Sequence, residues 1–272
     1  MRDSTGPDFI EAVARGLDVI TAFGSTGQNR SLAELAAATG LARPTVRRIL
    51  LTLDELGYVR SDAGTFSLTA RVLDLGMAYV SASSIWEIAR PHLSELSVRT
   101  GESCSLAQLD GSDIVYVARV AVPKLVTLSV SIGTRFPAPV TSLGKVLLAA
   151  LDPAELDRVL ALPTRSTVVT ASSPERDETL ASLREVRAAG WALTDQQLGP
   201  AIRSVAAPVR DGSGRVVAAV NVNAHAAETS VETLIDEHLP ALLTAASAIS
   251  SDWARWESRP LAELSEHPKL AR

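Results

Sequence analysis

The sequence predicts an α+β protein in two parts, a small helical head and a larger α/β domain built on an antiparallel sheet. Helical periodicity recurs in three short segments before residue 57, and an alternating hairpin pattern follows them. Beyond residue 100, alternating strand segments are interleaved with helical ones. The serine-containing stretch 81–84 separates the two patterns, so we expect domains at residues 1–83 and 84–272.

The head begins with three predicted helices. The first covers 8–23, and its regularly spaced apolar residues are Ile10, Val13, Leu17 and Ile20. The capping-box pair Ser31 and Glu34 begins the second helix, which ends at Gly40. Pro44 lies where the first residue of a third helix belongs. That helix places its apolar residues on one stripe: Val46, Ile49, Leu50, Leu53 and Leu56.

Two alternating segments, 58–60 and 65–68, flank the turn-type residues 61–64 and predict a small hairpin. A further helix over 71–82 is expected to link the head to the rest of the chain. The order of three helices and a hairpin, with a three-residue turn before the third helix, is that of a winged helix-turn-helix. In such a unit the N-terminal residues of the third helix enter the major groove of DNA.

Basic residues gather at that end of the third helix. Arginine can form paired hydrogen bonds to guanine, and threonine can contact a thymine methyl group or a phosphate. A solvated helix face would also carry arginines, but the order of elements favours double-stranded DNA as the partner. The predicted contacts on the helix and on the hairpin are Arg43, Thr45, Arg47, Arg48 and Arg60.

The second domain alternates between strand and helix patterns. Strands are expected at 103–120, in two segments around Asp110-Gly111, and at 125–133, 202–209 and 215–223. Helices are expected at 85–99, 142–150, 153–161, 174–189 and 231–250, the fourth capped by Ser173. The tail 258–272 is polar, holds two prolines and is expected to be mobile.

Composition excludes several classes of protein. The net charge of -5 opposes a nonspecific nucleic-acid coat, and no stretch is long and apolar enough for a membrane helix. One cysteine excludes an intramolecular disulfide and suits the cytoplasm. The four histidines are too scattered for a metal site, and we expect no cofactor. Cys104 is expected to be a core residue, because it alternates with two serines.

Polar residues also follow one face of several predicted strands. Asn221 and Asn223 alternate with valines, and Ser103 and Ser105 do the same around Cys104. Ser204 alternates in the same way. A ligand pocket and a solvent-facing sheet edge would both give this pattern, which does not separate them.

The residues Thr141 and Ser142 lie at a helix start, where backbone N–H groups attract an anion. The segment PVTSLGKVLLAA lacks the glycine and the hydroxyl residue that a phosphate-binding loop needs around its Gly-Lys pair. A ligand carboxylate could bind at this helix start, but capping of the helix by its own side chain is the favoured interpretation.

Several longer segments, which contain the helices, strands and polar residues described above, carry a resemblance to a known family. In the head they are FIEAVARGLDVITAF, LAELAAATGLARPTVRRILLTLDELGYV and FSLTARVLDLG. In the second domain they are RTGESCSLAQLDGSDIVYVARV, VSIGTRFPAPVTSLGKVLLAAL and AIRSVAAPVRDGSGRVVAAVNVNAHA. Over roughly residues 7–253 the chain resembles the IclR-type transcriptional regulators. It is most similar to the branch that controls breakdown of protocatechuate and 4-hydroxybenzoate through the β-ketoadipate pathway.

The resemblance implies a GAF-like effector domain, a homodimer or tetramer, and DNA binding modulated by a small organic acid. It places effector contacts at Ser142, Leu143, Asp195, Ser204, Asn221 and Asn223. Relatives that bind glyoxylate-sized acids often carry Gly-Ala, Cys and paired serines at these positions, so the departures suit a different, larger acid. Other candidates for a carboxylate partner, each expected to be a surface charge instead, are Arg119, Lys124, Arg135 and Arg203.

We therefore expect a ligand-responsive regulator of aromatic-acid catabolism that is not an enzyme. No Gly-x-Ser-x-Gly nucleophile elbow is present, and His225 is the only histidine close to the presumed pocket. Two alternatives stay open: an enzyme domain fused to a DNA-binding head, and a second domain that only mediates assembly.

Overall fold

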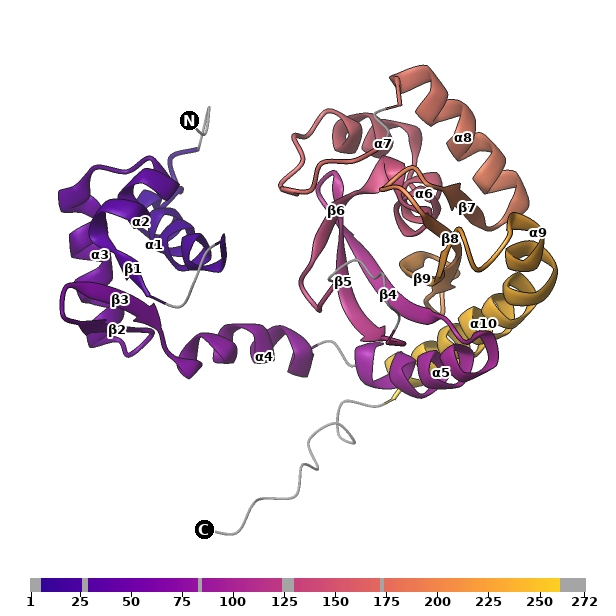
Figure 1. The fold of residues 1–272 in the computed structure, drawn as a ribbon, viewed down its shortest axis with the longest axis horizontal. Coiled ribbons are helices and arrows are strands. Elements are labelled where there is room, and N and C mark those ends of the chain that lie inside the picture. Colours follow the sequence, from indigo (N-terminus) through magenta and orange to yellow (C-terminus); the bar gives the residue numbers. More distant parts are fainter. Residues whose placement is uncertain (1–5, 26–28, 83–84, 124–129, 172–173, 260–272) are drawn as a thin grey trace, which may run out of the picture. The chain divides into compact units, whose positions relative to one another are not determined.

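The structure is a computed structural model that describes residues 6–25, 29–82, 85–123, 130–171 and 174–259 (Figure 1). The chain divides into two compact units, Met1–Ser83 and Ser84–Arg272. Together the described residues confirm the α+β class and the expected kinds of element in each unit. No helix in these ranges is long and apolar enough to cross a membrane.

The N-terminal unit contains three helices and a small sheet. The helices are α1 (Glu11–Ala22), α2 (Leu32–Thr39) and α3 (Arg43–Glu55), and α4 (Leu73–Ala82) follows a short 3-10 turn. Strands β2 (Val59–Asp62) and β3 (Thr65–Leu68) form the predicted hairpin. A two-residue strand that the sequence did not predict, β1 (Arg30–Ser31), pairs with β3, giving the order β1-β3-β2.

Local sequence explains where these elements begin and end. The capping box is confirmed: the Ser31 hydroxyl accepts a hydrogen bond from the Glu34 N–H, and the Glu34 carboxylate accepts one from the Ser31 N–H. Gly40 ends α2 in the left-handed conformation, with φ 67°. Pro44 is the second residue of α3 rather than the first, because Ala42 is the N-cap.

The hairpin turn follows from backbone geometry. Ala63 and Gly64 both have positive φ, 45° and 82°, which matches the twist of a two-residue hairpin turn. The buried core below it is formed by apolar residues of all three helices and the hairpin: Val19, Phe23, Leu35, Ala36, Val46, Leu50, Leu53, Val59 and Phe66.

Most of the predicted apolar stripe of α1 is not buried, and of its four residues only Ile20 packs, partly buried, against the core. Ile10, Val13 and Leu17 are exposed at 66%, 58% and 51%, whereas Val19 is fully buried. Leu56, expected on the buried stripe of α3, is also half exposed. Periodicity identified the helix correctly, but α1 is apolar over more than one face, and packing against α2 and α3 selected the face with Val19.

The C-terminal unit is built on a six-stranded antiparallel sheet with the order β6-β5-β4-β9-β8-β7. Its strands are β4 (Ser103–Asp110), β5 (Asp113–Val120), β6 (Arg135–Pro137), β7 (Ala192–Asp195), β8 (Ile202–Arg210) and β9 (Val216–His225). Its main helices are α5 (Ile85–Thr100), α6 (Ser142–Ala149), α7 (Pro153–Leu160), α8 (Arg176–Ala189) and α10 (Leu239–Glu257).

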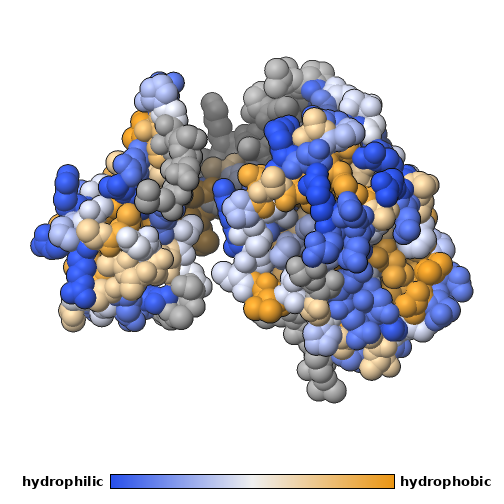
Figure 2. Space-filling view, turned by 90° about the horizontal axis from the view of Figure 1, so that it is seen from above, coloured by the Kyte–Doolittle hydropathy of each residue, from blue (hydrophilic) through white to orange (hydrophobic). Residues whose placement is uncertain are grey.

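Each face of the sheet has its own apolar core. Helices α5 and α10 lie together against one face (Figure 1) and bury residues such as Cys104, Val205 and Val222. Helix α6 packs on the other face, with α8 outside it, and buries Tyr116, Phe136 and Leu143 among others. All eight residues of α6 are buried, including Lys145. On the side seen in Figure 2, hydrophilic residues cover much of this unit.

Two expectations for this unit need correction, and a third falls mostly outside the described residues. The strand expected at 125–133 is wrong for residues 130–133, which form a turn before β6, and its other residues lie outside the described ranges. The expected cap Ser173 also lies outside them, and α8 begins at Arg176 with Glu175 as its N-cap. The tail was expected to be mobile from residue 258, and its residues 260–272 are not described.

The last helical region is longer than expected. It begins with a three-residue helix, α9 (Val231–Thr233), passes through a π-helical segment, Leu234–His238, and continues in α10 to Glu257. Pro240 has no N–H, so it cannot donate the usual bond to the carbonyl four residues earlier. The Leu239 N–H donates to the carbonyl of Leu234, five residues back, which is the wider π spacing.

Candidate DNA interface and effector site

The basic end of α3 is free for an anionic partner. Arg43, Arg47 and Arg48 are exposed, and Thr45 is half-buried beside them. The first turn of α3 holds no acidic residue, and no carboxylate in the described ranges forms an ion pair with these arginines. The cations therefore add to the positive end of the helix dipole, a combination that attracts phosphate.

The predicted DNA contact on the hairpin, Arg60, is also accessible. Arg60 lies exposed on β2, opposite Ser67 of β3. Nearby, the guanidinium of Arg71 stacks 5.4 Å above the ring of Tyr58, which joins the base of the hairpin to the turn before α4. The hairpin is thus held in place while its basic side chain stays accessible.

In the second unit, strand pairing brings the predicted polar residues together. β4 lies between β5 and β9, with Ser103 opposite Asn223 and Ser105 opposite Asn221. On the other side of β9, Ser204 of β8 is also opposite Asn223. Residues that are opposite each other in an antiparallel pair share a face, so these side chains all project toward α6.

A hydrogen-bonded cluster joins this face to the start of α6. The Ser142 and Ser204 hydroxyls are 2.7 Å apart. The side-chain amide of Asn221 donates to the Ser204 hydroxyl at 3.0 Å and to the side-chain oxygen (Oδ1) of Asn223 at 3.0 Å. Ser142, Ser204 and Asn221 are almost fully buried. The polar cluster therefore consists of Ser142, Ser204, Asn221 and Asn223.

The neighbouring residues of α6 have structural roles. The Thr141 hydroxyl accepts a hydrogen bond from the Gly144 N–H at 3.0 Å, which confirms that this side chain caps its own helix. Leu143 is 1% exposed and packs in the apolar core beneath α6. Gly144 lies so close to Ala138 that no side chain fits between the two backbones.

Asp195 lies apart from the polar cluster. It ends β7 opposite Arg203, one position beyond the pair of Thr194 and Ser204, so it projects from the other face of the sheet. Arg203 donates two hydrogen bonds to its carboxylate, at 2.7 and 3.3 Å, and these hold the pKa of Asp195 below its usual range. Arg203 faces away from Ser204, as its alternation indicated, and its role for an effector stays a prediction like that of Asp195.

Two residues of β5 add to the polar face in a way that the sequence did not indicate. Arg119 is opposite Ser105 and donates to its hydroxyl at 3.1 Å, and Tyr116 is opposite Ala107. Strand pairing skips Val117, and this bulge places Tyr116 and Arg119 on one face although they are three residues apart. Alternation alone would have put them on opposite faces.

Arg119 is half-buried rather than the surface charge that was expected. Burial lowers the pKa of its guanidinium, because the charged form loses water contacts. Arg135, in contrast, forms an ion pair with Asp110. Lys124 lies outside the described residues.

Two cavities are found elsewhere in this unit. One, of about 960 Å³, lies at the C-terminal end of α6, away from Ser142, and its lining includes Ala150, Glu155, Pro208 and Val216. The other, of about 610 Å³, lies between η3 (Ala138–Val140) and the segment before α8. Neither is lined by the polar cluster.

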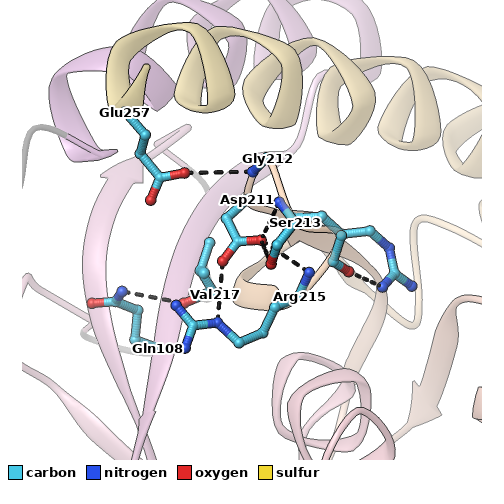
Figure 3. Close-up of polar contacts among 9 residues, drawn as sticks. Gln108, Asp211, Gly212, Ser213, Arg215, Val217 and Glu257 are labelled. Carbon is cyan, nitrogen blue, oxygen red and sulfur yellow. Dashed lines mark hydrogen bonds and ion pairs between the residues drawn. The ribbon is translucent and has the colours of Figure 1, made fainter. Parts of the chain in front are cut away.

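The β8–β9 hairpin borders the larger cavity and is held from three directions (Figure 3). The carboxylate of Asp211 accepts hydrogen bonds from the Ser213 N–H and hydroxyl and from Arg215. Glu257 of α10 accepts one from the Gly212 N–H, and Gln108 of β4 donates to the Val217 carbonyl. These contacts fix the end of the sheet that lies farthest from the polar cluster.

The expectation that Cys104 is a core residue is confirmed. Its side chain is 0% exposed, on the sheet face that α5 and α10 cover. Burial raises the pKa of the thiol to about 12. Within the described ranges, no group of three or more histidine, cysteine, aspartate or glutamate residues could hold a metal ion.

We expect Cys104 to resist thiol reagents in the folded protein. With a pKa of about 12, about one thiol in ten thousand is ionised at pH 8, and the thiolate is the reactive form. Labelling by a chromogenic disulfide reagent should be negligible over an hour and complete after addition of denaturing urea. Rapid labelling without urea would contradict the burial of this residue.

An exposed cationic helix end in one unit and a buried polar cluster in the other define a class: a DNA-binding regulator with an effector-binding domain. Similarity to known families narrows the class. Residues 12–63 match the IclR helix-turn-helix domain, and residues 77–251 match the bacterial transcriptional regulator IclR C-terminal domain. The chain belongs to the IclR family of transcriptional regulators.

Individual relatives agree with this assignment. The chain is 39% identical over 240 residues to the Pca regulon regulatory protein of Pseudomonas putida, covering 88% of this chain and 82% of that one. It is 31% identical to the p-hydroxybenzoate hydroxylase transcriptional activator of Acinetobacter baylyi, covering 89% and 91%. A solved transcriptional regulator from Rhodococcus sp. RHA1 is 46% identical, with a TM-score of 0.78 and coverage of 91% and 100%.

Proposed function

We propose that this protein regulates genes of aromatic-acid breakdown and that a small organic acid, bound at the polar cluster, controls its binding to DNA. The observation that carries the proposal is the cluster itself. Residues from one helix and two strands, far apart in the sequence, meet through short hydrogen bonds on one face of the sheet. Such a set of convergent polar groups between apolar walls is typical of sites that orient small ligands.

The names of the relatives support the aromatic class of ligand. The Pseudomonas and Acinetobacter proteins are named for the Pca regulon and for p-hydroxybenzoate hydroxylase. Glycine and alanine, which the small-acid branch often carries at the start of α6, are replaced here by Ser142 and Leu143. These larger side chains suit an effector that differs from a two-carbon acid.

On the DNA side, we propose that α3 lies in the major groove of an operator and that the hairpin contacts the backbone, which places the protein in the cytoplasm with its DNA. One such head covers few base pairs, so a homodimer or tetramer would bind paired half-sites. The exposed apolar side chains of α1 support self-association. The proposed DNA contacts are Arg43, Thr45, Arg47, Arg48 and Arg60.

The effector would act by shifting the equilibrium between two arrangements of the protein assembly. A ligand that binds one arrangement of the assembly more tightly favours that arrangement and so changes the spacing or mobility of the DNA-reading heads. No chemical change in the acid is needed. Incubation with the acid followed by chromatography should return it unaltered, whereas consumption of the acid would support the alternative of an enzyme domain.

We expect aromatic acids to stabilise the full-length protein against unfolding. The panel is protocatechuate, 4-hydroxybenzoate, catechol, cis,cis-muconate, β-ketoadipate and glyoxylate. At a hundred times its Kd, a bound acid should add about 2.7 kcal/mol to the free energy of unfolding, which thermal melts detect as a raised midpoint. The aromatic acids should shift the midpoint most and glyoxylate least.

The matched control separates the polar cluster from general effects. Asn221→Ala should remove the shift, whereas Asn29→Ala should preserve it because Asn29 is exposed in the other unit. A flat response to every acid, with DNA binding intact, would favour the alternative in which this unit only mediates assembly.

A further inference from the structure

Resting on the placement of α3 in the major groove proposed above, we infer that Leu51 contacts the C5-methyl group of a thymine in each operator half-site. This makes Leu51 a residue that sets sequence specificity, beside the arginines that attract the DNA. The operator should therefore carry a T·A pair one to two base pairs from the bases that Arg47 and Arg48 contact.

Leu51 is an apolar side chain on the polar face of α3. It is 46% exposed, whereas Leu50 and Leu53 are buried. It is not part of the apolar core formed by the described residues of the head, so packing inside the head does not explain it. The exposed residues of the helix are Arg43, Pro44, Arg47, Arg48, Leu51, Thr52, Asp54 and Glu55.

Helix geometry places Leu51 in the middle of this exposed face. Residues three and four apart are neighbours on a helix surface, so Leu51 lies one turn beyond both Arg48 and Arg47. The buried residues Val46 and Leu53 lie on the other side of the helix. When such a helix occupies the major groove, side chains in the middle of the exposed face meet the base edges, and those at its margins meet the phosphates.

The residues around Leu51 limit what else this turn of the helix offers to DNA. The Thr52 hydroxyl donates to the Arg48 carbonyl oxygen at 3.0 Å, so this donor is used within the helix. Asp54 and Glu55 follow, and their carboxylates repel phosphates. The surface that suits DNA therefore ends near Leu51, and this last position offers an apolar contact.

DNA suits this position better than a second copy of the chain. The exposed apolar residues Val13 and Leu17 lie one turn apart on α1 and suit self-association. Leu51 instead neighbours Arg47 and Arg48, which form no ion pair within the described ranges. Two such faces would repel each other, whereas the negative charge of DNA attracts both arginines.

The thymine methyl group is the apolar feature that base edges present in the major groove. Along the helix axis, Leu51 lies roughly 4.5 Å beyond Arg48 and roughly 6 Å beyond Arg47. Base pairs are stacked about 3.4 Å apart, so this distance corresponds to one or two steps along the DNA. Since arginine pairs best with guanine, the half-site should contain a guanine and, one to two pairs away, a thymine.

The test removes single methyl groups from the DNA. Duplexes selected from a random pool by the full-length wild-type protein are resynthesised with deoxyuridine in place of one thymidine at a time, which deletes the C5-methyl group and keeps the base pair. At one position of each half-site, the wild type should lose about fourfold in affinity, the effect of withdrawing one methyl group from an apolar contact. Leu51→Ala should lose a similar factor on the unmodified duplex and nothing further at that position.

Variants assign the sensitivity to the leucine side chain. Leu51→Met keeps an apolar side chain of similar volume and should retain most of the sensitivity to the methyl group. Leu162→Ala is the matched control, because Leu162 is 49% exposed in the other unit and its loss should leave the sensitivity unchanged. Sedimentation and melting midpoints verify the assembly and the fold of each variant.

The outcomes separate this inference from the proposed function. The inference is wrong if no thymine in the selected duplex is sensitive to loss of its methyl group, if Leu51→Ala keeps the wild-type sensitivity, or if this variant loses affinity because the assembly dissociates. In each of these cases the placement of α3 stands as long as Arg47→Ala weakens binding. If Arg47→Ala and Arg48→Ala both bind as the wild type does, the placement of α3 fails, and the inference fails with it.

Discussion

Replacing Gly144 by alanine should destabilise the C-terminal unit by about 3 kcal/mol, although alanine is the better helix former by about 1 kcal/mol. A Cβ atom at Gly144 would lie 2.1 Å from the carbonyl oxygen of Ala138 and 2.4 Å from its Cα. Both are backbone atoms, so no side chain can rotate away, and α6 must move. The steric term therefore outweighs the gain in helix propensity.

The displacement should also weaken effector binding. Gly144 is two residues after Ser142, whose hydroxyl meets Ser204 at 2.7 Å, a contact that tolerates little movement of the helix. Urea unfolding monitored by tryptophan fluorescence gives the loss of stability, and acid-induced stabilisation reports on the site. Gly212→Ala is the matched control, because the nearest atom to its new Cβ is the Cβ of Ala254 at 3.6 Å, an ordinary contact. A Gly144→Ala protein as stable as this control would refute the close approach.

Arg47→Ala and Arg48→Ala should each weaken operator binding by about 10- to 100-fold, the range expected when a base or phosphate contact is lost. Both side chains are exposed and contribute no ion pair in the described part of the chain, so their removal should change unfolding free energy by no more than about 0.5 kcal/mol. Binding is measured on duplexes selected from a random pool by the wild-type protein, at several salt concentrations.

The salt dependence tells which kind of contact each arginine makes. Loss of a phosphate contact should lower the slope of log K against log salt by about one and weaken all duplexes alike. Loss of a base contact should instead relax the preference at one position of the selected sequence. Arg184→Ala, in the other unit, should change neither quantity. Unchanged binding by both α3 variants would mean that another element reads the DNA.

These two predictions differ in how far the sequence alone supports them. The arginine helix was identified from local signals: a capping box, a helix-ending glycine, a short turn and a hairpin. Each signal acts over a few residues, through backbone hydrogen bonds and allowed φ values, so no distant contact is needed to interpret it. The clash at Gly144 could not be predicted, because it depends on how closely η3 approaches α6.

The effector site shows the same division. Strand alternation placed Asn221 with Asn223, and Ser103 with Ser105, on common faces, because side chains alternate along any strand. Alternation and the helix start also singled out Ser204 and Ser142, resemblance to the family assigned both to the effector pocket, and their hydroxyls are 2.7 Å apart in the structure. Resemblance also suggested Asp195, which pairs with Arg203 on the other face of the sheet and whose role for an effector stays a prediction.

By itself, the sequence determined the α+β class, the main helices, the hairpin and four strands of the larger sheet (β4, β5, β8 and β9), and the alternation of polar residues along those strands, since these follow from local backbone geometry. It did not predict β1, β6 or β7. Only the tertiary structure decided which sheet face α6 covers, which face of α1 is buried and where the bulge at Val117 turns Arg119. Those outcomes depend on packing between segments far apart in the chain, where several arrangements satisfy the same local pattern and the burial of apolar surface selects one.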